Sequence, residues 1–488
     1  MKQAVLGFYG YFLIFLAGCL TAPLLVALIY RETGCAAAFL ITIAVCAVPG
    51  AVFRKTSGLR FHDSRLRQRY GYMIASSAWL VASVIGALPY LITGSIPDAA
   101  DAFFETCSGF STTGSTILEE IESLPKSILF WRSLTQWIGG MGIMVLFAAL
   151  LPDFGIKGQS IAGAETPGPV MTKVSSRFSG TARLMYTAYI ILTIALTVLL
   201  IPGGMGLYDA VCHAMTCMAT GGYSTYNDGV MHFNSYYIYW ILTVFMFLAG
   251  TNFNLFFVAL RGNLRKTLRD DEFRAYCIIL LASIAMITAS LMTAGRYTDF
   301  GKALTDAAFQ AVTLMTTTGY ASADFILWPA FAQMILVLLM FSGGCSSSTA
   351  GGIKVVRVIV FLRMIKHEIM RILHLNIIDD IKYNRRRMMP ETLTYILAFL
   401  TAYIFTLTGA TLLLSATGDG NLVTNFTAAL TCISNVGPGL DLAGPVCNFH
   451  FYSDFSTILL SLLMIAGRLE LFTFMVLFTK YFWRPDRV

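Results

Sequence analysis

The sequence predicts an all-α integral membrane protein, in which two N-terminal transmembrane helices precede pseudo-fourfold M1–P–M2 repeats around one pore. Three observations predict this fold class. Hydrophobic residues make up 56% of the 488 residues and charged residues only 12%, so lipid must be the main solvent of the chain. Ten apolar segments are long enough to cross a membrane. A motif that is too short to cross returns four times between them, which indicates an internal repeat.

The ten apolar segments divide the chain into a leading pair of spans and four repeats. The predicted spans are 4–30, 35–53, 71–93, 128–151, 182–202, 236–260, 276–294, 330–363, 392–415 and 455–482. The predicted units are 1–69, which holds the leading spans and a basic loop, and the repeats 70–152, 153–261, 262–387 and 388–488. Each repeat has a first span (M1), a re-entrant helix with an extended return (P) and a second span (M2). Extended backbone at membrane depth must be buried in protein or line water.

The charges of the loops predict the orientation. Lys and Arg gather in residues 54–69, 261–274 and 363–387, whereas residues 204–235 and 416–454 contain neither. The positive-inside rule therefore places the basic loops and both termini in the cytoplasm and opens all four repeats to the outside. The net charge of +7 is divided among loops in this way, so it does not indicate a nucleic-acid partner.

The repeated motif has one internal spacing. Its copies are DAFFETCSGFSTTGS, DAVCHAMTCMATGGY, DAAFQAVTLMTTTGY and TNFTAALTCISNVGP. Each copy places a glycine 13 residues after a residue type that often caps helices, namely Asp101, Asp209, Asp306 and Thr424. Each also has a hydroxyl seven residues after that position, at Ser108, Thr216, Thr313 and Thr431. We expect four short helices that begin at these caps and point their C-terminal ends towards the membrane centre.

The glycine of each copy suits a cation-selective pore. A helix C-terminus carries a partial negative charge that favours a cation, and glycine lets successive carbonyls face one axis. Rings of carbonyls that replace the hydration shell form K⁺-selective filters. The predicted filter, with K⁺ as the substrate, consists of Thr112, Thr113, Gly114, Thr220, Gly221, Gly222, Thr317, Thr318, Gly319, Asn435, Val436 and Gly437. The alternative is that these glycines only allow close helix packing.

The first residue of each filter segment is expected to add an oxygen at the inner end of the pore. Threonine supplies a hydroxyl there in the first three repeats, and Asn435 breaks the set in the fourth. Pro438 also replaces the serine or tyrosine that follows the glycine in the other copies. We therefore expect the fourth repeat to be asymmetric.

The second span of the third repeat is interrupted by SGGCSSSTAGG at Ser342–Gly352. Four glycines and a run of hydroxyls break a helix, and such backbone must line water or be buried in protein. The predicted gate consists of Gly343, Gly344, Cys345, Ser346, Ser347, Ser348, Thr349, Ala350, Gly351 and Gly352, with Lys354 and Arg468. A kinked helix packed through small residues is the alternative.

Arg468 stands in the second span of the fourth repeat, where the other repeats have Gly140, Thr251 and Gly344. An arginine at the bilayer centre costs about 3 kcal/mol, so it needs a partner or a function. Below a cation filter it would form a barrier to ions. A structural ion pair or carbonyl contact is the alternative, and Glu470 faces elsewhere on an ideal helix.

The segments GFSTTGS, ATGGYST, TTTGYAS, SNVGPG, GGCSSSTAGGIKVVR and AGRLELF resemble the Trk/Ktr/HKT superfamily of K⁺ transporters over essentially the whole chain. The resemblance implies K⁺ uptake through a filter lined by Gly114, Gly222, Gly319 and Gly437. It also implies an intramembrane gating loop at Gly343–Gly352 with Lys354, guarded by Arg468. Sodium-permeable plant members have serine at the first filter glycine, so Gly114 favours K⁺.

The resemblance further implies partners and a location. Family members are homodimers that bind a cytoplasmic ring of nucleotide-binding RCK subunits of the TrkA type. No nucleotide motif is present in this sequence. The resemblance thus places any ATP or NAD on the partner, leaves this chain without an organic cofactor and implies a bacterial inner membrane.

Two other function classes remain as alternatives. A K⁺/H⁺ or Na⁺-permeable symporter would need titratable residues that relay protons through the spans, and the spans lack such a chain. An integral-membrane enzyme would need a catalytic set at one depth. His213 has Glu105, Gln310 and Ala428 as its counterparts in the other copies, which is no repeated set. We therefore predict a non-enzyme, and the sequence leaves channel and coupled transporter open.

Overall fold

The computed structural model describes residues 2–57, 68–142, 178–373 and 380–483. Within these ranges the chain is mainly helical, and its strands form a single hairpin of β1 (Lys382–Tyr383) and β2 (Arg386–Arg387). Several of its helices are apolar and long enough to cross a membrane. The predicted all-α membrane-protein fold class is confirmed.

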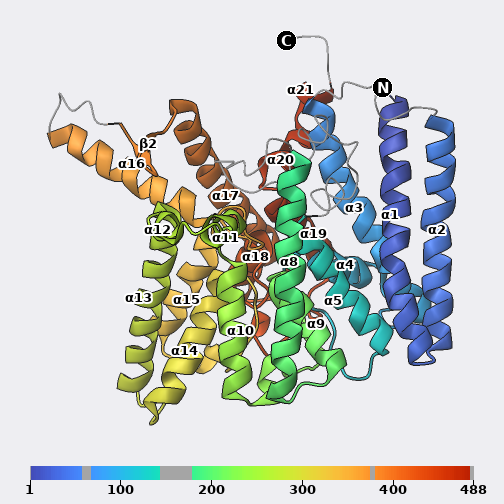
Figure 1. Cartoon of the computed structure of the whole chain (residues 1–488), viewed down its shortest axis with the longest axis horizontal. Helices are drawn as coiled ribbons and strands as arrows, with labels where there is room; N and C mark the ends of the chain where they lie inside the picture. Colours follow the sequence, from blue (N-terminus) through green and yellow to red (C-terminus); the bar gives the residue numbers. More distant parts are fainter. Residues whose placement is uncertain (1, 58–67, 143–177, 374–379, 484–488) are drawn as a thin grey trace.

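Two long helices, α1 (Lys2–Ile29) and α2 (Thr33–Ser57), stand side by side at one edge of the molecule (Figure 1). Small residues let them approach closely. A Cβ atom added to Gly10 would lie 3.0 Å from the carbonyl oxygen of Gly50. Membrane helices commonly pack through such residues, because lipid supplies no hydrophobic drive between them.

The rest of the chain repeats one order of helices. A long outer helix comes first in each set: α3 (Gln68–Thr93), α8 (Phe178–Leu200), α13 (Asp271–Thr293) and α17 (Pro390–Thr417). A short inner helix follows, which we call the pore helix: α4 (Ala99–Ser111), α9 (Leu207–Met218), α14 (Phe300–Met315) and α18 (Leu422–Ser434). A third helix completes each set: α5 (Lys126–Gly140), α10 (Tyr236–Ala249), α15 (Ala330–Ser342) and α19 (Asp454–Arg468). A pore helix of 13 residues is about 20 Å long, too short for a hydrocarbon core of about 30 Å.

Shorter elements connect and extend these sets. The remaining α-helices are α11 (Phe253–Leu260), α12 (Leu264–Leu268), α16 (Val355–Leu373), α20 (Phe472–Met475) and α21 (Lys480–Trp483). The 3₁₀ turns are η2 (Ile201–Gly203), η3 (Gly229–Phe233), η4 (Phe325–Leu327), η5 (Asp441–Ala443) and η6 (Val476–Phe478).

The four sets of helices close into a circle. Each third helix packs on the pore helix of the next set: α5 on α9, α10 on α14 and α15 on α18. The last third helix, α19, packs back on α4. The pore helices therefore surround one centre, while α1 and α2 lie outside the circle (Figure 1). The predicted unit boundaries stay predictions, and the one at 152 lies outside the described residues.

The sixth and tenth predicted spans are not continuous in the structure. The chain bends by 95° between α10 and α11 and by 114° between α19 and the turn of helix that begins at Phe472. The eighth span is broken between α15 and α16, as the interruption at Ser342–Gly352 predicts. The fourth extends past residue 142, beyond the described residues. Six described helices, or eight if each bent pair counts as one span, meet the length and hydropathy needed to cross. Gly250 lies at the first bend, and the left-handed residues Glu470 and Leu471 lie at the second. Apolar composition predicts that a segment lies in the membrane but does not predict such a bend.

The predicted helix caps are also wrong. The pore helices are capped at Asp98, Gly206, Asp299 and Asn421, three to seven residues earlier than expected. The predicted cap residues lie one or two turns inside the helix, and three of them bond to the outer return of the same motif. Asp209 accepts from Thr225 at 2.7 Å, and Asp306 accepts from Ser322 at 2.9 Å. In the fourth motif the bond is reversed: Thr424 donates to Asp441, and this bond lowers the pKa of Asp441.

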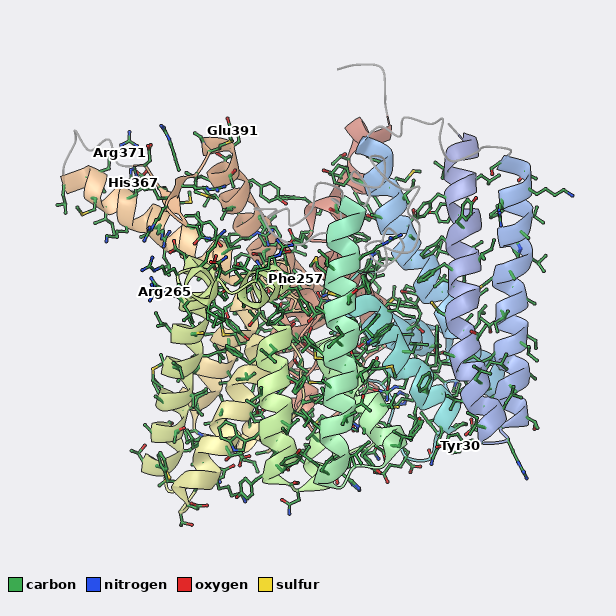
Figure 2. All side chains as sticks on the ribbon, in the orientation of Figure 1. Tyr30, Phe257, Arg265, His367, Arg371 and Glu391 are labelled. Carbon is green, nitrogen blue, oxygen red and sulfur yellow. The ribbon has the colours of Figure 1, made fainter. Side chains whose placement is uncertain are left out.

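Polar groups gather inside the molecule and apolar side chains face outward, as expected for a protein solvated by lipid. Glu105, Arg132, Glu272, Lys354 and Arg357 are all at most 2% exposed. The outer helix α8 exposes Ile190, Ile191, Ile194 and Val198. Figure 2 shows His367, Arg371 and Glu391 at the end of the molecule opposite Tyr30. This separation agrees with the predicted orientation, which stays a prediction.

Candidate functional site

The four pore helices end in one backbone conformation. Their last turns run into left-handed residues with φ of 58° at Thr112, 55° at Thr220, 57° at Thr317 and 56° at Asn435. Two residues later comes each motif glycine, with φ between 78° and 100°. The intervening residue donates its backbone N–H to the repeated hydroxyl residue five positions back, as in Thr113 N to Ser108 O at 3.0 Å. β-Branched residues avoid the left-handed region, so the strain at the three threonines indicates a function for these segments, whereas asparagine adopts this region readily.

The twelve predicted filter residues come together at the centre of the circle of helices. We call these four segments, 112–114, 220–222, 317–319 and 435–437, the ring. A Cβ atom on Gly114 would lie 2.1 Å from the carbonyl oxygen of Gly221, and one on Gly222 would lie 2.1 Å from that of Thr318. The same test on Gly319 meets Val436 O at 2.2 Å, and on Gly437 it meets Thr113 O at 2.8 Å. Each glycine thus faces the middle residue of the next motif, and the fourth returns to the first. No L side chain fits at these positions without displacing a backbone carbonyl.

The residue after each glycine fastens its motif to the preceding one. Ser115 donates to Gly437 O at 3.0 Å, Tyr223 to Glu105 O at 2.9 Å and Tyr320 to His213 O at 3.2 Å. Pro438 has no such donor and packs beside Gly319. The amide of Asn435 donates into the wall, to Thr113 Oγ1 at 3.0 Å and Met464 O at 2.9 Å. The fourth motif therefore differs from the others, as its sequence predicts.

The hydroxyls of the three inner threonines differ in their hydrogen bonding, and their predicted contribution to the pore stays a prediction. Thr112 Oγ1 is buried without a hydrogen-bond partner among the described residues. Thr220 Oγ1 instead donates to Ala219 O at 2.6 Å. Thr317 Oγ1 accepts from the backbone N–H of Gly351 at 2.7 Å. Thr317 differs from the other two threonines because the interrupting loop donates to its hydroxyl.

The predicted gate segment, Gly343–Gly352, is a buried loop in contact with the ring. Besides the bond to Thr317, it donates from Gly352 N to Ser434 O, next to Asn435, at 2.9 Å. Cys345 N donates to Gly250 O at 2.9 Å, and Thr349 Oγ1 donates to Ala249 O at 3.1 Å. The loop is thereby bonded to the second, third and fourth sets of helices at once.

Lys354 and Arg468 border this loop. The ammonium of Lys354 donates to Ala350 O, within its own turn of chain. The guanidinium of Arg468 donates to Thr349 O and Gly139 O, both at 2.8 Å, and to Gly140 O. Arg468 therefore links the loop to the carbonyl end of α5, where a helix favours positive charge.

Two buried ion pairs were missed from the sequence. Glu470 pairs with Arg357 beside the loop. Glu105 pairs with Arg132 at 2.8 Å behind the first motif, and both are at most 1% exposed. Arg132 also donates to Ser224 O of the second motif and lies 4.0 Å from the centre of the Tyr223 ring. An arginine in an apolar run and a glutamate in a pore helix were the available signals.

On its outer side the ring opens into a cavity of about 120 Å³. All four motif glycines line it, together with Arg132, Tyr223, Tyr320 and Pro438. Carbonyls and hydroxyls thus stand between an open cavity on one side and a buried loop on the other. This arrangement can strip and pass a small cation, and the described residues contain no cluster of His, Cys, Asp and Glu that could hold a metal ion.

The family is decided by a match over nearly the whole chain. A family model named TrkH, described as a cation transport protein, matches residues 35–484. The chain belongs to the TrkH family. The match includes every residue of the ring and of the loop, and the resemblance inferred from the motifs is confirmed.

Individual TrkH relatives cover the full length. The Trk system potassium uptake protein TrkH of Salmonella typhimurium is 35% identical over 486 residues, which is 99% of both chains. The Escherichia coli protein of that name is 35% identical over 490 residues, again 99% of both. The crystal structure of the potassium transporter TrkH from Vibrio parahaemolyticus matches with a TM-score of 0.89 and 33% identity over 99% of this chain and 100% of that one. All these names describe transport proteins.

Proposed function

We propose that the chain takes up K⁺ across a bacterial inner membrane through the ring of Gly114, Gly222, Gly319 and Gly437. The observation that carries this proposal is the cyclic approach of each glycine to the middle carbonyl of the next motif. Only backbone oxygens and small side chains fit at this constriction, and carbonyl rings replace the hydration shell of K⁺. The potassium uptake named for the relatives supports the choice of ion.

The proposed gate is the loop Gly343–Gly352 with Lys354 and Arg468. Its hydrogen bonds to Thr317 and Ser434 O support a position on the inner side of the ring. In this arrangement the guanidinium of Arg468 adds a positive charge to the cation path. Ions pass when the loop leaves the ring.

The proposed assembly is a homodimer that binds a cytoplasmic RCK/TrkA-type regulator. The resemblance to the superfamily supports it, as do the basic segments 261–274 and 363–387 of the sequence. ATP or NAD would bind to the regulator, and K⁺ is the ion carried by this chain.

The test is uptake of ⁸⁶Rb⁺ into proteoliposomes, with external K⁺ or Na⁺ as the competitor. For the wild type we expect competition by K⁺ but not by Na⁺, and for Gly114→Ser we expect that discrimination to weaken. Gly409→Ser is the matched control, since a Cβ atom there meets no atom within 4 Å. Absence of cation flux, with or without an RCK regulator, would contradict the proposal.

A further inference from the structure

The loop is hydrogen-bonded to a buried carboxylate of α13, a helix that contains none of the predicted gate residues. Glu272 lies in the first turn of α13 and is 1% exposed. It accepts from Ser346 N and Ser346 Oγ, both at 2.6 Å, and from Val356 N at 3.2 Å. Ser346 belongs to the loop, and Val356 lies in the first turn of α16. One side chain therefore ties both sides of the interruption to α13.

The three bonds depend on one another. A buried carboxylate is costly unless donors surround it, and the N–H of Val356 is one of the helix-end donors that α16 cannot satisfy itself. Bonds to a charged acceptor are stronger than neutral ones. If the loop withdrew from the ring, Glu272 would lose two of its three donors together. The carboxylate thus favours the loop position seen here.

The helix end that carries Glu272 is itself bonded to the hairpin β1–β2. Asn384, in the turn of the hairpin, exchanges hydrogen bonds with Asp271: Asn384 N donates to Oδ2 at 3.0 Å, and Asp271 N donates to Asn384 Oδ1 at 2.8 Å. Asn384 Nδ2 also donates to Asp270 at 2.7 Å. Arg363 of α16 pairs with Asp271 at 2.9 Å. These contacts directly precede Glu272 in the chain.

We propose that Glu272 is the positioning residue that holds the loop against the ring, and that the hairpin sets the place of Glu272 through Asn384. The proposal rests on the proposed function, since it assigns a cause to the closed state of that gate. A force that draws the hairpin from α13 would loosen the grip of Glu272 on Ser346 and Val356. Movement of the hairpin, on the face that we assign to the cytoplasm, would then release the loop and open the gate.

Labelling of Cys345 tests the proposal without relying on ion flux. Cys345 lies in the loop and is fully buried, so a variant that keeps it as the only one of the ten cysteines reports loop release. In proteoliposomes we expect a small maleimide to label this thiol about tenfold faster in Glu272→Gln, because an amide cannot accept all three bonds. Asn384→Ala should accelerate labelling about threefold, because it removes the side-chain bonds to Asp271 N and to the carboxylate of Asp270. Glu368→Gln, on the exposed face of α16, is the matched control and should change nothing.

Each outcome decides a part of the proposal. Equal labelling of Glu272→Gln and the control would overturn the role of Glu272. If Glu272→Gln does not yield folded protein, Ser346→Ala decides, because it removes one bond from the loop side and should raise labelling about threefold. Unchanged labelling in Asn384→Ala would overturn the role of the hairpin. A wild type that labels slowly yet carries no ⁸⁶Rb⁺ would refute the proposed function while leaving the labelling result to decide on Glu272.

Discussion

The ring and the loop touch each other but are built in opposite ways. The ring repeats one backbone conformation four times, and each glycine meets a carbonyl of its neighbour. The loop occurs once and is held by side chains that differ in kind and origin, from Thr317, Glu272 and Arg468. The difference indicates separate duties. A backbone ring tolerates no side chain and suits selection of an ion, whereas a loop held by a few hydrogen bonds can be released.

The largest effect is expected from a side chain in the ring. Gly222→Ala places a Cβ atom 2.1 Å from Thr318 O, at a φ of 78° that alanine avoids. We expect at least a tenfold loss of K⁺ over Na⁺ preference in ⁸⁶Rb⁺ competition, since strain of 1–3 kcal/mol, about 1.4 of which is worth a factor of ten, falls on this segment. Gly409→Ala is the control. Retention of the wild-type preference would show that the ring does not select.

The support behind the ring comes next. Arg132→Met leaves Glu105 buried without its ion partner, and breaking such a pair costs about 3–5 kcal/mol. We expect a lower melting temperature and weaker ion discrimination, because Arg132 also bonds to Ser224 O. Arg363→Met, which breaks a partly exposed pair with Asp271, should cost about 1 kcal/mol at most. Similar melting temperatures for both variants would remove the special place of Arg132.

Removing the charge below the ring should raise flux. A positive charge within about 8 Å of the ion path opposes a cation by about 2 kcal/mol at an effective dielectric constant of about 20. Arg468→Ala is therefore expected to increase ⁸⁶Rb⁺ flux about ten- to thirtyfold, since about 1.4 kcal/mol is worth a factor of ten. Arg468→Lys separates charge from geometry, since lysine keeps the charge but not the fork that links Thr349 to α5. Unchanged flux in folded Arg468→Ala would exclude the barrier.

The smallest effect compares two equivalent residues. Thr317→Val removes the acceptor of Gly351 N–H, a bond worth about 1 kcal/mol, so flux without a regulator should rise about fivefold. Thr220→Val is the control, because the hydroxyl of Thr220 bonds only within its own segment to Ala219 O. An equal response of both variants would show that the contact between ring and loop does not govern opening.

The ring could be predicted from the sequence because its motif occurs four times with one internal spacing. The sequence also revealed the loop, since glycines and serines stand out in an apolar span. It did not reveal Glu272 or the pair of Glu105 and Arg132. These contacts join residues 27 to 84 positions apart, and each occurs only once. No repeat or period reports a contact of that kind.

Local rules also failed where tertiary contacts override them. Asp209 and Asp306 have the residue type of a helix cap, but their carboxylates bond to the outer return instead. The spans after the second and fourth pore helices are apolar enough overall to cross a membrane, yet they bend at Gly250 and after Arg468. The composition of a segment predicts whether lipid or water surrounds it, whereas the direction of its backbone depends on tertiary packing.

The most direct measurement of the central claim is the position of a heavy K⁺ analogue in the protein. Crystals grown with Rb⁺ can be measured at the rubidium absorption edge, where anomalous scattering locates the ion. We expect the strongest peak on the ring axis, among the carbonyls of Thr113, Gly221, Thr318 and Val436, and its loss when Na⁺ replaces Rb⁺. A ring without a peak, or a peak that Na⁺ leaves unchanged, would contradict the assignment of this ring as the selectivity filter.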